Sequence, residues 1–328
     1  MKIDIYTHII PPKYKKALYQ RADGRFFSEN WEKVINGTPG LTDLDNRLRI
    51  LEKYEGLSQV LTIASPALEE AASPENAVYL AKLGNDEIAE LISKYPDKFA
   101  AGVACLPIND MDAALKEAER TINDLGFKGI QLYTPTNGKP LDSPEFYPLY
   151  EMMAEYDLPI LIHPARGRHI PDYPGEDHSR YYIYQMFGWP YETTAAMVRL
   201  VFSGMFDKYP GIKFITHHCG AMLPFFSERL VVGQDYAAEN LKARWKQALK
   251  KPPIEYFKEF YADTALNGNS AALACGYDFF GSERTVFATD FPYDNENGER
   301  FTREVIHAVN SLDIGLEEKD MIYHLNAR

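Results

Sequence analysis

Cysteine is scarce in this sequence. Its three cysteines, Cys105, Cys219 and Cys275, are odd in number and lie far apart along the 328 residues. They therefore predict neither a disulfide framework nor a paired metal-binding knuckle, and they indicate a reducing, cytoplasmic setting. Cys219 could act as a nucleophile or as a metal ligand, but a free cysteine is more often a small buried residue. We favour that interpretation of Cys219.

Long apolar runs and an excess of positive charge are also missing. No apolar run approaches the roughly 20 residues that cross a bilayer. The apolar start of the chain contains Asp4 and His8, which is not typical of a signal peptide. The 35 lysines and arginines are outnumbered by 47 aspartates and glutamates, which gives a net charge of −12. Because phosphate binding needs a basic patch, we expect no nucleic acid as a partner, and no membrane either.

No glycine-rich dinucleotide turn follows the first apolar segment, which weighs against a doubly wound, open sheet. Instead, eight short apolar segments, typical of strands buried on both faces of a parallel sheet, alternate with segments of helical spacing. The predicted strands cover residues 2–8, 59–64, 99–106, 128–132, 158–163, 212–217, 259–263 and 284–289. Eight such units predict an α/β fold, a single-domain (β/α)8 TIM barrel over residues 1–328, with a doubly wound sheet as the alternative.

Two excursions interrupt this alternation, at about residues 13–40 after the first strand and at about residues 164–190 after the fifth. Each follows the carboxyl end of a strand, so we expect both to lie over the C-terminal face of the barrel. A charged and exposed helix is predicted over residues 242–251.

Histidine and aspartate residues stand where the predicted strands end. His8 ends the first strand, His163 the fifth, the adjacent pair His217 and His218 the sixth, and Asp290 follows the eighth. Barrel enzymes build their sites at these carboxyl ends, and imidazole and carboxylate suit zinc and similar divalent metals. Neighbouring residues on a strand face opposite sides, so we expect only one of His217 and His218 to enter the barrel mouth. The other is expected to pack behind it.

The segments that carry these residues resemble the amidohydrolase superfamily, within it the branch of aminocarboxymuconate semialdehyde decarboxylase and γ-resorcylate decarboxylase. The resemblance covers nearly the whole chain and rests on DIYTHIIPP, GFKGIQLYTPTNGKPLDSPEFYPLYEMMAEYDLPILIHP, GWPYETTAAMVRLVFSGMFDKYPGIKFITHHCGAMLPFFSERL and FATDFPYD. It implies a metal-dependent TIM barrel that works as a homodimer. It also implies one divalent metal, zinc in the first place and manganese as the alternative, held by His8, His163 and Asp290. The implied catalytic residues are Asp290 and His218, the histidine of HCGAMLPF.

The resemblance further implies how an acidic substrate is held. Arg229 corresponds to an arginine that a neighbouring subunit contributes to the substrate's carboxylate. Arg47 or Arg49 matches an arginine on the first helix of the family. The second excursion varies within the family, so nothing is carried onto it. Arg166 in that excursion and Glu192 just after it are added as candidate substrate-binding residues.

The first strand departs from the family pattern. It usually ends in His-x-His or Glu-x-His, whereas here it ends in Tyr6, Thr7 and His8. Side chains two residues apart share a face, so Tyr6 enters the same barrel mouth as His8. A protonated tyrosine, with a pKa near 10, is a poor ligand, although a bound metal could lower that pKa. Tyr6 is therefore an unusual metal ligand, a donor beside the metal that contacts the substrate, or a sign of weakened metal binding.

Taken together, these residues predict nonoxidative decarboxylation of an unsaturated or aromatic acid of the hydroxybenzoate or muconate type. The metal would act as a Lewis acid, Asp290 or His218 would move a proton, and arginines would hold the small acidic substrate. The first alternative is a hydrolase, in which a metal-bound hydroxide attacks an amide, a lactone or a C–C bond beside a carbonyl. The second is a non-catalytic barrel that binds a small acid.

Overall fold

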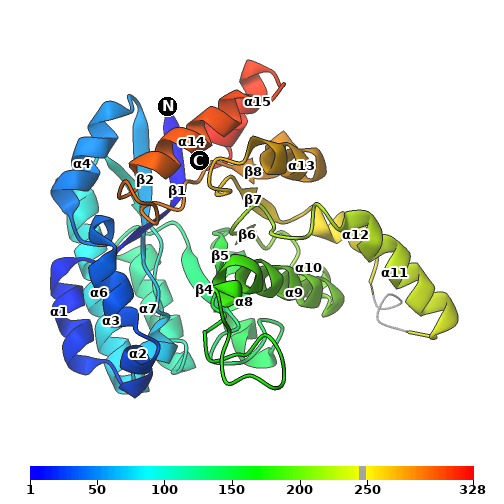
Figure 1. The fold of residues 1–328 in the computed structure, drawn as a ribbon, viewed down its shortest axis with the longest axis horizontal. Helices are drawn as coiled ribbons and strands as arrows, with labels where there is room; N and C mark the ends of the chain where they lie inside the picture. The colour runs from blue at the N-terminus through cyan, green and yellow to red at the C-terminus, as the bar shows by residue number, and fades with distance from the viewer. Residues whose placement is uncertain (244–248) are drawn as a thin grey trace.

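The structure is a computed structural model and describes residues 1–243 and 249–328. Within these residues, eight parallel strands overlap the eight predicted segments, and helices pack around them (Figure 1). The strands are β1 (Lys2–Ile9), β2 (Leu57–Ile63), β3 (Phe99–Gly102), β4 (Ile130–Thr134), β5 (Ile160–Pro164), β6 (Phe214–Thr216), β7 (Tyr261–Asp263) and β8 (Thr285–Val286).

The described strands close into a ring. Hydrogen bonds join them into two arcs, one in the order β1-β2-β3 and the other from β4 to β8. Isolated parallel bridges connect the arcs, because Ala104 pairs with Ile130 and Thr7 pairs with Phe291. The backbone N–H of His8 also donates to the carbonyl of Phe291 at 2.8 Å. The prediction of a (β/α)8 TIM barrel is confirmed, and the doubly wound alternative is not.

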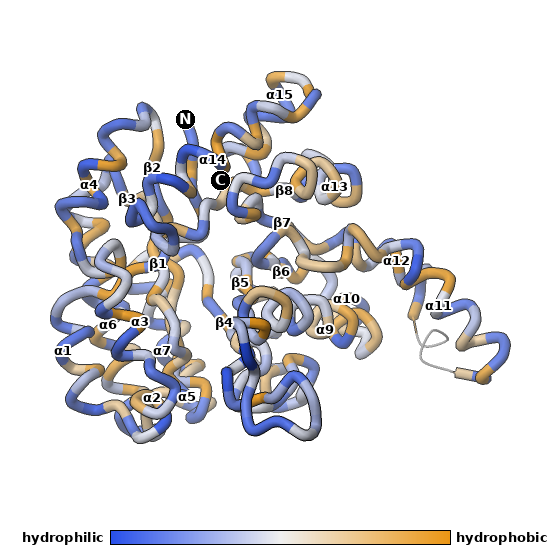
Figure 2. Tube along the Cα trace, viewed as in Figure 1, coloured by the Kyte–Doolittle hydropathy of each residue, from blue (hydrophilic) through white to orange (hydrophobic). Residues whose placement is uncertain are grey.

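The two faces of each strand pack into different apolar clusters. The barrel interior is filled mainly by Ile3, Ile5, Val60, Val103, Leu161, Ile215, Val286 and Ala288. On β2, Val60 belongs to this interior cluster, whereas Leu61 and Ile63 belong to the larger cluster under the helices. Along α1 and α4 the chain alternates between hydrophilic and hydrophobic residues (Figure 2), as expected for helices that lay one face on a barrel.

The end of β8 explains how the barrel presents Asp290. The strand is shorter than the predicted segment 284–289. From Ala288 onward, side chains in and beside other strands supply bonds to the backbone, and the first of them is the hydroxyl of Thr264, which bonds to both the N–H and the carbonyl of Ala288. The backbone N–H and the hydroxyl of Thr289 donate to Asp4 at 2.9 Å and 2.5 Å. Asp290 then adopts a left-handed φ of 65°. The chain therefore leaves the strand direction at Asp290.

The first excursion folds into α1 (Pro12–Arg21), α2 (Gly24–Ser28), α3 (Trp31–Gly37) and the short η1 (Pro39–Leu41). The second has little regular structure before η3 (Tyr184–Gly188). Nδ1 of His169 lies 2.9 Å from Oε1 of Glu29, so the two excursions meet. The remaining helical elements are α4 (Leu44–Lys53), α5 (Leu68–Ala71), α6 (Pro74–Lys94), α7 (Met111–Asn123), η2 (Pro144–Phe146), α8 (Tyr147–Glu155), α9 (Trp189–Phe202), α10 (Met205–Lys208), α11 (Ser227–Asn240), α12 (Pro253–Phe257), α13 (Ser270–Phe280), η5 (Ser282–Arg284), α14 (Glu299–Asn310), α15 (Leu316–Asp320) and η6 (Met321–Leu325).

Helix α11 extends away from the barrel (Figure 1). It exposes Val232 and Tyr236, and Phe225 just before it is also exposed. The charged helix predicted over 242–251 includes residues 244–248, which lie outside the described residues. Among the described helices, none is long and apolar enough to cross a membrane.

Candidate active site

The barrel mouth brings together the side chains predicted from the strand ends. The carboxylate of Asp290 lies at the centre, with Oδ1 at 3.3 Å from Nε2 of His8 and 3.2 Å from Nε2 of His217. Its Oδ2 lies 3.8 Å from Nε2 of His218. One ring nitrogen each of His8, His163 and His217 lie within 4.8 Å of one another. Four histidines and one carboxylate therefore share one small volume.

Burial and neighbouring charges set the protonation of this cluster. Burial lowers the pKa of His8 and lowers that of His163 well below its ordinary value, helped at His163 by the two neighbouring imidazoles. Burial alone would raise the pKa of Asp290, but His217, His218 and His8 hold it well below its usual range. The site therefore combines two neutral imidazoles, those of His8 and His163, with an ionised carboxylate.

Hydrogen bonds behind two of the rings leave one nitrogen of each free. Nδ1 of His163 donates to the carbonyl of Pro164 at 2.6 Å. The hydroxyl of Thr62 donates to the carbonyl of Thr7 at 3.0 Å, so Nδ1 of His8, 3.2 Å from that hydroxyl, is the donor. Nε2 of both rings therefore carries a lone pair. This arrangement is typical of metal-binding histidines, whose second nitrogen is held by a carbonyl, carboxylate or hydroxyl.

The donor set fits a divalent metal ion. Nε2 of His8 is buried and has no hydrogen-bond partner among the described residues. A buried polar atom without a partner costs free energy unless something binds it. Two neutral imidazole nitrogens and an ionised carboxylate are ligands that zinc and related metals accept. His8, His163 and Asp290 could therefore hold such an ion.

His217 and His218 both reach this cluster, contrary to the alternation that we expected. β6 ends at Thr216, and His218 and Cys219 adopt left-handed backbone with φ of 57° and 56°. The ring centroids of the two histidines consequently lie only 4.0 Å apart. As predicted, only His218 lines the cavity at the mouth, and His217 is buried behind it. The two rings do not face opposite sides, however, because the side-to-side alternation of a strand does not continue through a left-handed turn.

Asp263, the last residue of β7, is a site residue that the sequence analysis missed. It accepts a hydrogen bond from Nδ1 of His217, and its other oxygen accepts bonds from the backbone N–H groups of Cys219 at 2.9 Å and Ala265 at 3.0 Å. Burial lowers the pKa of His217, but Asp263 and Asp290 outweigh it and raise that pKa to about 10. The available signal was a carboxylate at the end of the weakly marked seventh strand.

A cavity of about 780 Å³ opens from the cluster toward the two excursions. His218, Asp290 and Tyr293 line its inner end. Its outer walls include Arg25, Trp31, Arg166, Arg168, Tyr184 and Trp189. The volume lies within the range of roughly 300–1,000 Å³ that is usual for small-molecule sites. Aromatic and arginine side chains together suit a ligand with a flat ring and an acidic group.

The sequence matches a known protein family over almost its entire length. Residues 3–328 match the family described as amidohydrolase. The chain belongs to the amidohydrolase family. The resemblance to the decarboxylase branch of the superfamily is also confirmed.

The chain is similar to γ-resorcylate decarboxylase of Polaromonas sp. (strain JS666), with 30% identity over 295 residues, 86% of this chain and 87% of the relative. It is similar to 2-amino-3-carboxymuconate-6-semialdehyde decarboxylase of Dictyostelium discoideum, with 28% identity over 89% of this chain and 82% of the relative. A crystal structure of dihydroxybenzoic acid decarboxylase from Polaromonas sp. JS666, with bound manganese and the inhibitor 2-nitroresorcinol, shares the fold. Its TM-score is 0.79 at 25% identity, and the match covers 99% of this chain and 95% of that one.

In this amidohydrolase, Tyr6 packs behind the cluster instead of facing the cavity. Its ring stacks on the ring of His217, with centroids 4.1 Å apart and planes inclined by 21°. The phenol is buried, and its oxygen has no hydrogen-bond partner within the described chain. Burial raises the pKa of Tyr6 well above its ordinary value. Tyr6 is therefore a neutral phenol, and it does not line the cavity that we assign to the substrate.

The other candidate substrate-binding residues lie in three different environments. Arg166 lines the cavity, and its Nη1 lies 3.0 Å from Oε1 of Glu192. Glu192 therefore holds Arg166 in place and does not itself line the cavity. Arg229 is exposed on α11 and does not line the cavity of its own chain.

Arg47 is buried beneath the first strand, away from the cavity. Its guanidinium donates to the carbonyl of His8 and, at 2.9 Å, to Oε1 of Gln59. The same group lies 4.3 Å from the ring centroid of Phe291. Burial lowers the pKa of Arg47 to about 9. Arg47 thus ties the His8 end of β1 to β2 and to the segment after β8.

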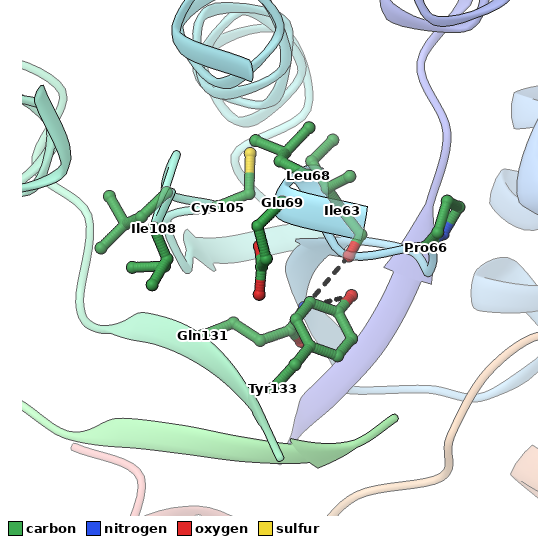
Figure 3. Close-up of a pocket in the computed structure, with 9 residues that line it drawn as sticks. Ile63, Pro66, Leu68, Glu69, Cys105, Ile108, Gln131 and Tyr133 are labelled. Atoms are coloured by element: carbon green, nitrogen blue, oxygen red, sulfur yellow. Dashed lines mark hydrogen bonds between the residues drawn. The ribbon is translucent and has the colours of Figure 1, made fainter. Parts of the chain in front are cut away.

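A second chamber beside the cavity is far too small for a substrate (Figure 3). Its volume is about 10 Å³, and Tyr133 lines both this chamber and the main cavity. Such a volume holds about one water molecule. Glu69 and Gln131 line it, and each has one side-chain oxygen without a hydrogen-bond partner in the described chain. Because burial raises the pKa of Glu69 to about 8, Glu69 is a neutral acid at neutral pH.

Proposed function

We propose that this protein is a metal-dependent enzyme that removes CO2 nonoxidatively from a small aromatic or unsaturated carboxylic acid. The observation that carries this proposal is one cluster at the inner end of a cavity lined by arginine and aromatic side chains. In it, ring nitrogens of His8 and His163 lie within 4.8 Å of each other, and Oδ1 of Asp290 lies 3.3 Å from Nε2 of His8, beside His218. The relatives described above are decarboxylases, which favours decarboxylation over the hydrolase alternative. The joint presence of His8, His163, His218 and Asp290 at one mouth also weighs against a non-catalytic binder.

The proposal includes one divalent ion per chain, held by His8, His163 and Asp290. The crystal structure of the relative from Polaromonas contains manganese. Zinc, our first expectation from the sequence, accepts the same ligands, so we propose zinc or manganese. When bound, such an ion acts as a Lewis acid that withdraws charge from oxygens of the substrate.

The remaining chemistry falls to His218. Its side chain is 18% exposed, it lines the cavity, and its Nδ1 has no hydrogen-bond partner among the described residues. We assign His218 the delivery of a proton to the carbon that loses the carboxylate. The C–C bond breaks, CO2 leaves, and a C–H bond takes its place, so one proton is consumed per turnover. Asp290, kept ionised, faces Nε2 of His218 and orients the ring.

Substrate binding is proposed to involve two chains of a homodimer. Arg166 lies in the cavity of its own chain, whereas Arg229 is exposed and lies outside it. Apolar side chains exposed on and beside α11, among them Phe225, Val232 and Leu241, are typical of a surface that another protein covers. We therefore propose that Arg229 acts on the substrate's carboxylate in the neighbouring subunit. The three cysteines are unpaired, which supports the proposal of a cytoplasmic enzyme.

Release of CO2 from a panel of acids tests the proposed function. Protein loaded with zinc or manganese, and protein stripped with a chelator, are incubated with γ-resorcylate, 5-carboxyvanillate and related hydroxybenzoates. We expect CO2 from at least one acid, and its loss after stripping. The matched control is His218→Asn, which should keep the metal and lose about 10²- to 10⁴-fold in turnover, the usual contribution of a general acid. CO2 release that survives complete removal of the metal would contradict the proposal.

A further inference from the structure

We propose that His217 is a fourth protein ligand of the metal ion and replaces the ligand that the first strand lacks at Tyr6. The inference rests on the metal dependence in the proposed function, and it is independent of whether the reaction is a decarboxylation. In the family pattern the first strand supplies two ligands, whereas here it supplies only His8. The imidazole stacked against the ring of Tyr6, 4.1 Å away, is that of His217.

The position of the His217 ring is that of a ligand. Its Nε2 lies 3.2 Å from Oδ1 of Asp290. A ring nitrogen of His217 also lies within 4.8 Å of nitrogens of His8 and His163. Atoms bound to one ion at about 2.1 Å lie at most about 4.2 Å apart. Among the described residues, His217 is the residue that two candidate metal-binding sets share, His8–His163–His217 and His217–His218–Asp290.

The group behind His217 is the one that metal-binding histidines commonly have. Nδ1 of His217 donates to Asp263, so Nε2 is directed at the cluster, where a metal ion would take the place of the proton that Nε2 shares with Asp290. Asp263 is itself fixed, because the backbone N–H groups of Cys219 and Ala265 donate to its other oxygen at 2.9 Å and 3.0 Å. A carboxylate that holds the far nitrogen of a histidine fixes the ring and raises its strength as a ligand.

The neighbouring His218 belongs to one of these candidate sets as well, but its contacts differ from those of His217. Nδ1 of His218 has no hydrogen-bond partner in the described residues, and its Nε2 lies 3.8 Å from Asp290. His218 lines the cavity, whereas His217 is fully buried and does not. The adjacent pair is therefore divided: His217 serves the metal and His218 serves the substrate.

The contacts of Tyr6 agree with the proposal that His217 replaces a ligand at position 6. Its ring supports the flat face of His217, and its hydroxyl bonds to none of the described residues. A histidine at position 6 would project from the same strand face as His8 and compete for the same side of the ion. Tyrosine at position 6 thus leaves one side of the ion free for the histidine at position 217.

Metal affinity, measured without any substrate, tests the inference. Zinc and manganese are titrated into metal-free protein against a fluorescent chelator, for wild type, His217→Gln and the matched control His218→Gln. We expect His217→Gln to weaken binding by more than about 100-fold, and Asp263→Asn by about 10- to 100-fold, as is usual for the loss of a group behind a ligand. His218→Gln should stay within about threefold of wild type. Equal melting temperatures of the metal-free proteins show that the barrel is intact.

A rescue experiment tests the replacement of the ligand at position 6 directly. In the His217→Gln background, Tyr6→His should restore affinity to within about tenfold of wild type, and Tyr6→Phe should restore none. Wild-type affinity in His217→Gln, an equal loss in His218→Gln, or no rescue by Tyr6→His would each overturn the inference. Because these readouts involve no turnover, a failure of CO2 release with the affinity pattern intact refutes only the proposed function.

Discussion

Replacement of Arg47 by methionine separates two roles for this buried arginine. Its guanidinium donates to His8 and Gln59 and lies over the ring of Phe291. Each hydrogen bond from a charged donor contributes about 1.5–3 kcal/mol, and a desolvated cation–π contact contributes about 2 kcal/mol. Relief of the cost of burying a charge, several kcal/mol, offsets much of this. We therefore expect a net loss of about 2–4 kcal/mol in the free energy of unfolding.

In a chain of this size such a loss lowers the melting temperature by roughly 3–6 °C. The assay is thermal and urea unfolding of metal-free protein, with KM measured on the metal-loaded enzyme. Arg49→Met is the matched control, because Arg49 lies on the same helix but is exposed and bonds to Asn46 at 2.6 Å. It should change stability by less than about 0.5 kcal/mol. An unchanged melting temperature with KM raised tenfold would refute this account and return Arg47 to the substrate-binding residues.

Four further experiments have defined outcomes. Asp290→Asn should abolish metal binding in a calorimetric titration while the far-ultraviolet spectrum stays unchanged; retained affinity would contradict the ligand assignment. The folded pKa of Glu69, about 8, lies above its ordinary 4.5, so stability present below pH 4.5 is lost as pH rises through 8. Glu69→Gln should therefore raise the melting temperature more at pH 9 than at pH 5, and an equal effect would count against a buried neutral acid. Mixing Arg229→Ala chains with His218→Ala chains should recover activity in mixed dimers. If heterodimers form but are inactive, Arg229 acts in the site of its own chain. Tyr6→Phe should change turnover less than about twofold, because the phenol oxygen has no partner in the described chain, and a loss of metal would show the phenol to be a ligand.

The barrel could be predicted from the sequence because each strand is a short apolar segment followed by a helical one. The lengths of the strands could not be predicted in this way. β8 stops at Val286, and beyond it Thr289 bonds to Asp4, a residue 285 positions away, and no local pattern reveals such a contact. The doubly buried strands and the helical stripes, in contrast, depend only on local periodicity.

Some residues of the candidate site could likewise be predicted from the sequence, and others could not. His8, His163 and Asp290 follow from their place at strand ends, since the ends of parallel strands meet at one face of a barrel. His217 and His218 lie in the same cluster because the backbone of His218 is left-handed, and an L-residue adopts that conformation only under tertiary constraint. Asp263 was missed for a related reason, because its importance appears only once His217 is known to lie against it.

Arg47 shows a different limit of sequence reasoning. The resemblance implied a place for Arg47 on a helix, and a charged residue on a surface helix is normally solvated. The structure buries it under β1, because backbone and side-chain acceptors of β1 and β2 satisfy its donors there. Which acceptors a long side chain finds depends on the register of neighbouring strands, and that register is a property of the assembled barrel.

Decarboxylation is tested most directly by running the metal-loaded enzyme on γ-resorcylate in D2O and following gas and product by mass spectrometry. We expect one CO2 for each molecule of product and one deuterium on the carbon that carried the carboxylate, with both lost in His218→Asn. Consumption of the acid without release of CO2, or a product with no deuterium on that carbon, would contradict decarboxylation.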